Sequence, residues 1–202
     1  MRFLWTMLAA LTLAGCSDNP APETAKTVAK PPAPIGGREA FYKVYPLART
    51  WAADCQPLRV RSMNLKEVPS EDGKTGAWEV VFVSPSLSRA RTFTWSAVEA
   101  EGNLHQGPFQ GPEESWSPGG QDKPFLMAAF KIDTPDALHT AVSKSPEYMN
   151  KKGEKPPVNF ILEATPRFPD PAWRVMWGES VSNAQNTVFV DATTGSFLER
   201  ER

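Results

Sequence analysis

Proline is spread along the whole chain and sets the strongest limit on its fold. Twenty of the 202 residues are proline, against 13 glycines. Because proline lacks a backbone N–H and disrupts the interior of helices, a long helical bundle is excluded. The sequence instead predicts short helices, strands and turns, with at least one proline-rich segment. Hydrophobic residues make up 41% of the chain, which is enough for a folded core.

Charges along the chain nearly balance. The formal net charge is −1, from 22 basic and 23 acidic residues. Nucleic-acid binding through bulk charge needs a basic excess, so nucleic acid is not an expected partner. The two cysteines, Cys16 and Cys55, are too few for a disulfide-rich scaffold.

Residues 1–15 contain a charged start and an apolar run with the lengths typical of a secretory signal peptide. Arg2 is followed by an apolar run over residues 3–13, which is too short to span a bilayer stably. The next residues, Leu13-Ala14-Gly15-Cys16, resemble the lipobox of bacterial lipoproteins. The resemblance implies cleavage before Cys16, diacylglycerol on its sulfur and a fatty acid such as palmitate on its new amino group. These acyl chains would hold the protein on a membrane. A plain secretory signal with an incidental cysteine is the alternative.

The residues after the lipobox bear on location. Ser17 stands where aspartate is the inner-membrane retention signal in some Gram-negative bacteria, so the resemblance implies the outer membrane, facing the periplasm. Residues 16–37 hold the lipidated cysteine and then five prolines without any aromatic residue. This segment is predicted to be a disordered tether between the membrane and a folded domain.

Residues 38–106 are predicted to form a helix followed by strands. Apolar residues recur at helical spacing from Phe41 to Cys55. Strand-like runs follow at 58–61, 77–83 and 89–98. Since Cys55 ends the apolar stripe, we predict a buried structural thiol rather than a nucleophile.

Residues 107–133 begin with a run rich in proline and glycine, which predicts a connector. Residues 134–202 then repeat the order of helix and strands, with Thr134 as the expected helix N-cap. The expected strands are at 158–164, 172–177 and 187–192.

The two halves also match at particular residues. Ala77-Trp78-Glu79-Val80 matches Ala172-Trp173-Arg174-Val175 at an offset of 95. We interpret the recurrence as a duplication. A chance similarity between two segments of strand-like composition is the alternative.

The second half resembles the PepSY and PepSY-like domains of bacterial envelope proteins. The resemblance rests on the helix, on Ala-Trp-Arg-Val, and on Val-Phe-Val-Asp-Ala-Thr-Thr-Gly, which ends at Gly195. It covers residues 134–200 clearly and 38–104 only faintly, because Glu99 replaces the aspartate. It implies an α+β fold of tandem cystatin-like units, each with a helix packed on an antiparallel sheet. It also implies a binding or protease-modulating module rather than a catalyst. Asp191 and Gly195 are expected to form a turn.

Three residues are candidates for binding. Trp116 lies in the connector, where no periodicity buries it, so it either fills the gap between the halves or anchors a partner. Arg59 and Arg61 alternate with apolar residues, which is typical of a solvated face and also suits an acidic partner or lipid headgroups. The sequence predicts no catalytic residue, metal ligand or cofactor.

We therefore expect a membrane-anchored envelope protein that binds a protein or peptide without catalysis, with a protease among the implied partners. The alternative is an enzyme, or an accessory subunit of one, that acts on cell-envelope substrates. That alternative requires a cleft with convergent polar groups and shifted titratable residues, and it would gain support if Glu113, Glu114 and His105 met in one pocket. A purely structural spacer is a third possibility and predicts neither pocket nor partner.

Overall fold

The structure is a computed structural model that describes residues 31–120, 122–149, 156–178 and 180–201. The chain divides into two compact units, Met1–Pro31 and Pro32–Arg202. The predicted signal peptide, Cys16 and most of the predicted tether lie outside the described residues. All elements below belong to the second unit.

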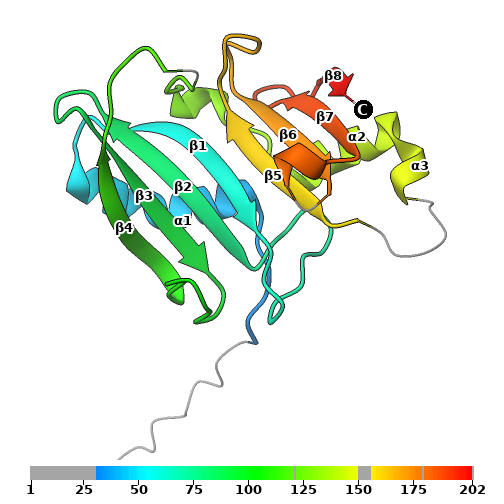
Figure 1. Cartoon of the computed structure of the whole chain (residues 1–202), viewed down its shortest axis with the longest axis horizontal. Coiled ribbons are helices and arrows are strands. Elements are labelled where there is room, and N and C mark those ends of the chain that lie inside the picture. The colour runs from blue at the N-terminus through cyan, green and yellow to red at the C-terminus, as the bar shows by residue number, and fades with distance from the viewer. Residues whose placement is uncertain (1–30, 121, 150–155, 179, 202) are drawn as a thin grey trace, which may run out of the picture. The chain divides into compact units, whose positions relative to one another are not determined.

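Eight strands form one antiparallel sheet in the order β4-β3-β2-β1-β5-β6-β7-β8 (Figure 1). Two four-stranded meanders are thus joined through their first strands. The predicted α+β class is confirmed, while the duplication stays a prediction. The strands are β1 (Gln56–Met63), β2 (Ala77–Ser84), β3 (Arg89–Ser96), β4 (Gly107–Ser115), β5 (Val158–Glu163), β6 (Ala172–Trp177), β7 (Asn186–Asp191) and β8 (Phe197–Glu201).

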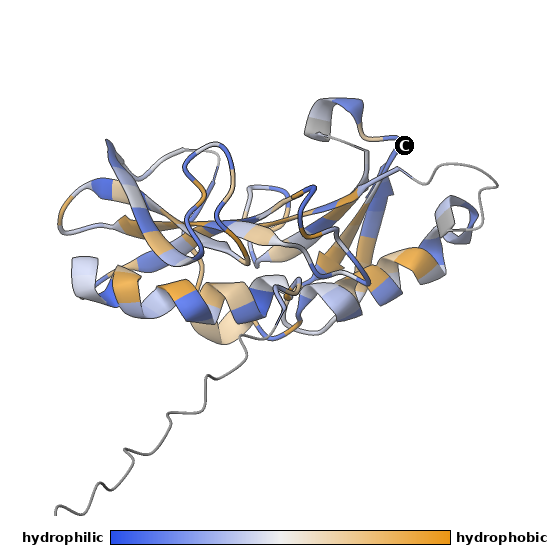
Figure 2. Ribbon diagram, turned by 90° about the horizontal axis from the view of Figure 1, so that it is seen from below, coloured by the Kyte–Doolittle hydropathy of each residue, from blue (hydrophilic) through white to orange (hydrophobic). Residues whose placement is uncertain are grey.

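Helices cover one face of the sheet, as the edge-on view in Figure 2 shows. The two longer helices are α1 (Gly37–Trp51) and α2 (Thr134–Lys144), and a short α3 (Pro146–Met149) follows α2. Two 3-10 turns, η1 (Met127–Ala129) and η2 (Val181–Asn183), lie in loops. Among the described residues, no helix combines the length and apolar character needed to cross a membrane.

The core lies between the helices and the sheet. Successive side chains of a strand point to opposite faces, and the aromatic residues of β2, β3, β5 and β6 lie on the helix side. Trp78 of β2 and Trp173 of β6 have no exposed surface, and their rings meet edge to face at 6.4 Å. The tryptophans of β2 and β6 are therefore part of the core. Because the two rings come from different meanders, one core runs through both halves.

The N-termini of α1 and α2 meet at one polar contact. The backbone N–H of Gly37 donates to Thr134 Oγ1 at 3.0 Å, and that of Arg38 donates to Asp133 Oδ1 at 2.8 Å. Asp133 also accepts from the N–H of Thr134, so Asp133 rather than Thr134 is the N-cap of α2. The N-cap of α1 is Gly36, which has no side chain to contribute. One carboxylate therefore serves both helix ends, where the helix dipoles favour negative charge.

The folded unit begins before the predicted end of the tether. Ile35 pairs with Thr75 through two backbone hydrogen bonds of 3.1 and 3.0 Å, and Gly37 is buried as the first residue of α1. Residues 35–37 are thus part of the fold rather than of a spacer.

The predicted connector over 107–133 is wrong at its start, because Gly107–Ser115 forms β4. Pro108 and Pro112 do not prevent this, because β4 is an edge strand on which one row of N–H groups needs no partner. The first half consequently has four strands rather than the predicted three.

Helix α1 also ends earlier than predicted, at Trp51, four residues before Cys55. Cys55 is nevertheless buried, and this burial raises the pKa of its thiol. The prediction of a buried thiol is confirmed, although the residue lies in the turn before β1 and not on the helix.

Candidate binding site on the open face of the sheet

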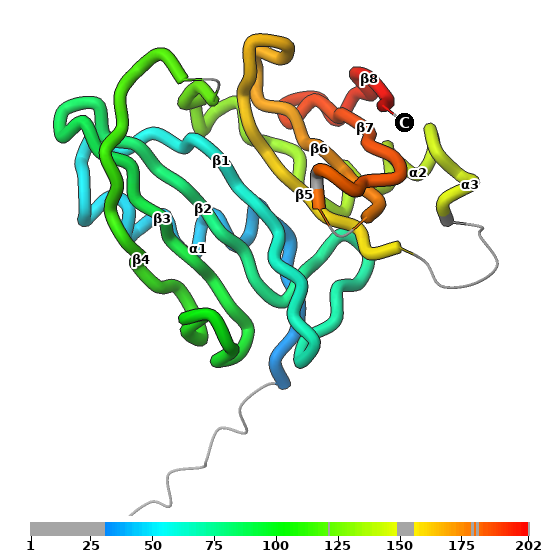
Figure 3. The backbone as a smooth tube through the Cα atoms, viewed as in Figure 1, coloured from blue at the N-terminus to red at the C-terminus, as the bar shows by residue number. Residues whose placement is uncertain are grey.

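The first strands of the two meanders meet at a short junction. β1 and β5 pair antiparallel only at Arg59 with Glu163, Val60 with Leu162, and Arg61 with Ile161 (Figure 3). Val60 and Leu162 face the helices and are fully buried. The other four side chains alternate with them and therefore lie on the face without helices, which we call the open face.

Segments next to the junction complete its backbone hydrogen bonds. On one side, the loop after β4 inserts, with Lys123 N–H donating to Ala164 O at 3.0 Å and Phe125 N–H donating to Pro57 O at 2.9 Å. On the other side, Phe160 N–H donates to the buried Ser62 Oγ at 2.8 Å. The junction is therefore a closed floor made from both meanders and the loop.

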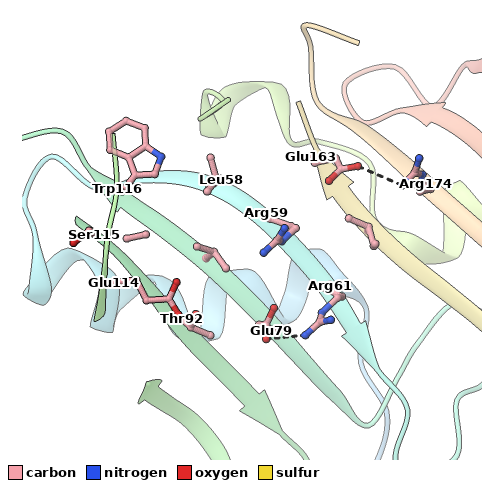
Figure 4. Close-up of a pocket in the computed structure, with 13 residues that line it drawn as sticks. Leu58, Arg59, Arg61, Glu79, Thr92, Glu114, Ser115, Trp116, Glu163 and Arg174 are labelled. Carbon is pink, nitrogen blue, oxygen red and sulfur yellow. Dashed lines mark hydrogen bonds and ion pairs between the residues drawn. The ribbon is translucent and has the colours of Figure 1, made fainter. Parts of the chain in front are cut away.

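A cavity of about 610 Å³ lies on the open face over this junction (Figure 4). Three arginines, Arg59 and Arg61 of β1 and Arg174 of β6, line it together with the carboxylates Glu79, Glu114 and Glu163. Apolar residues of its wall include Val81 and Ile161, both buried although no helix covers them.

Each arginine has one acidic partner. Arg59 Nη1 lies 3.2 Å from Asp122, Arg61 Nη2 lies 2.9 Å from Glu79, and Arg174 Nη1 lies 3.8 Å from Glu163. The arginine is the more exposed member in every pair; for Arg61 and Glu79 the side-chain exposures are 48% and 19%. Within each pair, the guanidinium group is therefore more accessible than the carboxylate.

Two donors at the site lack acceptors. The Nε atoms of Arg59 and Arg174 are buried, and neither has a hydrogen-bond partner in the part of the chain that the structure describes. Buried donors normally find a partner, because an unmet donor costs free energy. These two atoms are therefore unsatisfied donors in the floor of the site.

Among the carboxylates that line the cavity, Glu163 has a shifted pKa. Desolvation by burial raises its pKa and Asp122 adds to this, whereas Arg174 and Arg59 oppose the shift. Burial outweighs the two arginines, so Glu163 binds a proton at a higher pH than an exposed glutamate does.

The ring of Trp116 stands at one end of the cavity (Figure 4). It packs against a small apolar cluster of the open face formed by Leu58, Val81, Val83 and Ala90. The residue is half-buried, and its backbone N–H donates to Ser88 O at 3.0 Å. Trp116 therefore lies outside the main core and packs against this small cluster. The residue remains partly exposed at the rim of the cavity.

The structure thus brings the three candidate residues, Trp116, Arg59 and Arg61, to one cavity. Sequence reasoning missed Arg174 as a site residue. Alternation with the buried Trp173 and Val175 places Arg174 on the open face, and alternation with the buried Leu162 and Ala164 does the same for Glu163. Only the β1–β5 pairing brings both of them to this cavity. Asp122 carried no comparable signal.

Glu113, Glu114 and His105, whose meeting would have supported an enzyme site, do not come together. Glu114 lines the cavity, whereas Glu113, its neighbour on β4, lies 3.6 Å from Arg91 and 3.3 Å from Trp51 Nε1. His105 pairs with Glu99 at 2.8 Å in the β3–β4 turn. Over the described ranges, no group of three or more His, Cys, Asp and Glu residues could hold a metal ion.

The turn expected at the end of β7 is confirmed. Asp191 Oδ1 accepts from the N–H groups of Thr193 and Thr194 at 2.7 and 2.8 Å. Gly195 has a φ of 76°, in the left-handed region that favours glycine. Both residues are fully engaged in shaping the turn.

Comparisons with known proteins give one structural likeness. No family model matches the chain, and no curated protein matches it significantly in sequence. The fold resembles the crystal structure of a putative lipoprotein from Clostridium difficile 630, with a TM-score of 0.53. The two share 9% sequence identity over 80% of this chain and 91% of that chain. At this identity the likeness shows a shared fold, and the likeness to PepSY domains remains one of short motifs.

Proposed function

We propose that this chain is a lipid-anchored envelope protein that binds a peptide or an extended segment of a protein on its open face. The observation that carries the binding role is the cavity over the β1–β5 junction, with its three arginines and the Trp116 ring at its rim. Arginine and tryptophan are enriched among residues that dominate binding energy at interfaces.

The anchor rests on separate support. Leu13-Ala14-Gly15-Cys16 has the form of a lipobox, and the structural neighbour carries the name of a lipoprotein. Acylation of Cys16 would hold the folded unit at a membrane surface, with the outer membrane as the proposed location.

Recognition fits the chemistry of the cavity better than catalysis. Its described lining includes neither histidine nor cysteine, and each of its three arginines stands in an ion pair. A general base needs a reacting partner within hydrogen-bond reach, whereas a binding surface needs donors, acceptors and apolar area, and the cavity offers all three.

We also infer that the two meanders with their helices are tandem copies of one unit. A specific contact recurs in both. Trp78 Nε1 donates to the carbonyl of Ile35 at 3.0 Å, and Trp173 Nε1 donates to that of Ile132 at 2.8 Å. Each isoleucine lies two residues before its helix, and each tryptophan lies on the second strand of its meander. The binding site would then lie where the two copies meet.

Site-specific photo-crosslinking in living bacteria tests the binding role. A photoreactive amino acid replaces Ser115 at the exposed rim of the cavity and, as a control, Lys43 on the exposed side of α1. We expect a discrete crosslinked product from position 115 that disappears with Trp116→Ala and does not form from position 43. Equal products from both positions, or none from position 115, would contradict the proposal.

A further inference from the structure

The cavity over the junction continues along the open face in both directions. It shares Arg61 and Ile161 with a hollow of about 430 Å³ that reaches Met176 of β6. In the other direction it shares Glu79 and Thr92 with a hollow of about 620 Å³ at the β3–β4 turn. Together the three hollows form a groove across β3, β2, β1, β5 and β6. Five strands span about 19 Å, the length of about six residues of extended polypeptide.

Many arginine N–H donors in the middle of this groove have no hydrogen-bond partner among the described residues. A guanidinium carries five N–H donors. Arg59 donates one hydrogen bond to Asp122 and Arg61 donates one to Glu79. Arg174 meets Glu163 only at ion-pair distance, 3.8 Å, and its guanidinium stacks 5.2 Å from the ring of Phe189. Within the described part of the chain, the three guanidinium groups therefore keep N–H donors for a further acidic group.

Strand register sets the spacing of two of these arginines. Arg61 pairs with Ile161, and Ile161 pairs with Arg174, so the three side chains form one row across the open face. The two arginines flank a buried isoleucine and lie two strand spacings apart, about 10 Å between Cα atoms. Long arginine side chains on either side of an apolar floor can both reach an acidic group placed over that floor.

Two of the three carboxylates that line the central cavity are less exposed than the arginines they pair with. Glu79 and Glu163 have side-chain exposures of 19% and 16%, against 48% for Arg61 and 24% for Arg174. Around Ile161, a ligand therefore meets the guanidinium groups of Arg61 and Arg174 before these two carboxylates. A highly charged polyanion does not fit equally well, because three carboxylates share the lining and the whole chain has a net charge of −1.

We propose that the groove selects extended polypeptide segments that carry an aspartate or glutamate side chain. Arg61 and Arg174 are the specificity-determining residues, since they hold the acidic side chain over Ile161. Trp116 and its apolar cluster contact an apolar residue of the same segment. The inference rests on the proposed binding function and names the chemistry of its ligand.

Fluorescence anisotropy with defined peptides tests the selection. The probes are three labelled peptides of about eight alanine, serine and leucine residues, identical except for two central positions that hold aspartate, asparagine or lysine. The full chain is used in a non-ionic detergent. We expect the aspartate peptide to bind about tenfold more tightly than the asparagine peptide, since charge-assisted hydrogen bonds contribute at least that much.

Variants assign the effect to the two arginines. Arg61→Gln and Arg174→Gln should each weaken binding of the aspartate peptide about tenfold. Arg61→Lys should weaken it less, because lysine keeps the positive charge although it lacks the planar guanidinium group. Arg49→Gln, on the exposed side of α1, is the matched control and leaves binding unchanged. Unchanged melting temperatures establish that the variants fold.

Each other result overturns the inference. Binding of the asparagine peptide at equal strength, insensitive to both arginine variants but quenching Trp116 fluorescence, would leave the binding function standing and remove the acidic selection. Preference for the lysine peptide would assign recognition to the carboxylates instead. Full displacement by inorganic phosphate would mean that a bare anion suffices. Failure of every peptide to bind would count against both the selection and the binding function.

Discussion

The shared cap at the two helix N-termini gives a prediction whose size follows from the structure. Asp133 accepts hydrogen bonds from the N–H groups of Thr134 at 2.7 Å and Arg38 at 2.8 Å, and Gly36 offers α1 no side-chain cap of its own. Loss of an N-cap side chain costs about 1 kcal/mol. Because Asp133→Ala removes the cap from two helices, we expect the free energy of unfolding to fall by about 2 kcal/mol.

Thermal unfolding followed by circular dichroism measures this change. For a unit of this size, a loss of about 2 kcal/mol corresponds to a fall of about 4–8 °C in melting temperature. Asp136→Ala is the matched control, because it removes an exposed carboxylate from the same first turn of α2 without a side-chain hydrogen bond. That control should cost only a few tenths of a kcal/mol, about the value of one exposed charge near a helix end.

A third variant separates hydrogen bonding from charge. Asparagine is as good an N-cap as aspartate, so Asp133→Asn should recover most of the lost stability. The reasoning is refuted when Asp133→Ala costs no more than Asp136→Ala. If Asp133→Asn lowers the free energy of unfolding as much as Asp133→Ala does, the negative charge, and not the hydrogen bonds, stabilises the two helix N-termini.

The remaining predictions concern the anchor, the junction and the repeated contact. Cys16→Ser should abolish incorporation of an alkyne-labelled palmitate in a bacterial host, and persistent labelling would exclude this anchor. The raised pKa of Glu163 means that its folded form holds a proton more tightly than its unfolded form, so its contribution to stability falls as pH rises through the folded pKa. The free energy of unfolding of Glu163→Gln should therefore rise relative to that of the unmodified chain as pH increases from about 4 to 7, as measured by urea titration. A difference between the two proteins that does not change with pH would contradict this. Trp78→Phe and Trp173→Phe should each cost about 2–3 kcal/mol, through a lost hydrogen bond and a small cavity; clearly unequal costs would weaken the equivalence of the two halves.

Local sequence patterns predicted most elements of the fold. Alternation of β-branched and aromatic residues identified β2 and β6 and placed Trp78 and Trp173 in the core. Prediction failed where position in the sheet decides the outcome. The prolines of β4 indicate a loop by local rules, yet they are compatible with an edge strand, and edge position is a property of the whole sheet.

The candidate site was predictable only in part, for a related reason. Arg59 and Arg61 are adjacent on one strand, so alternation alone placed them together. Their neighbours Glu163 and Arg174 arrive through the β1–β5 pairing, which joins residues about 100 positions apart. Local sequence patterns fix neither that pairing nor its register, so the acidic and basic groups across the junction could not be assigned from sequence.

The proposed duplication adds an argument for where function lies. At the offset of 95, Trp78 and Val80 correspond to Trp173 and Val175, and all four are fully buried against the helices. The position between them differs in charge, with Glu79 in the first half and Arg174 in the second, and it faces the cavity in both. Core positions are therefore the same in the two halves while the open face has opposite charges. Pairing with the neighbouring strand accounts for each charge separately, because Glu79 meets Arg61 and Arg174 meets Glu163. In the proposed groove, the same arrangement also presents guanidinium groups on both sides of Ile161, with Arg61 from one half and Arg174 from the other.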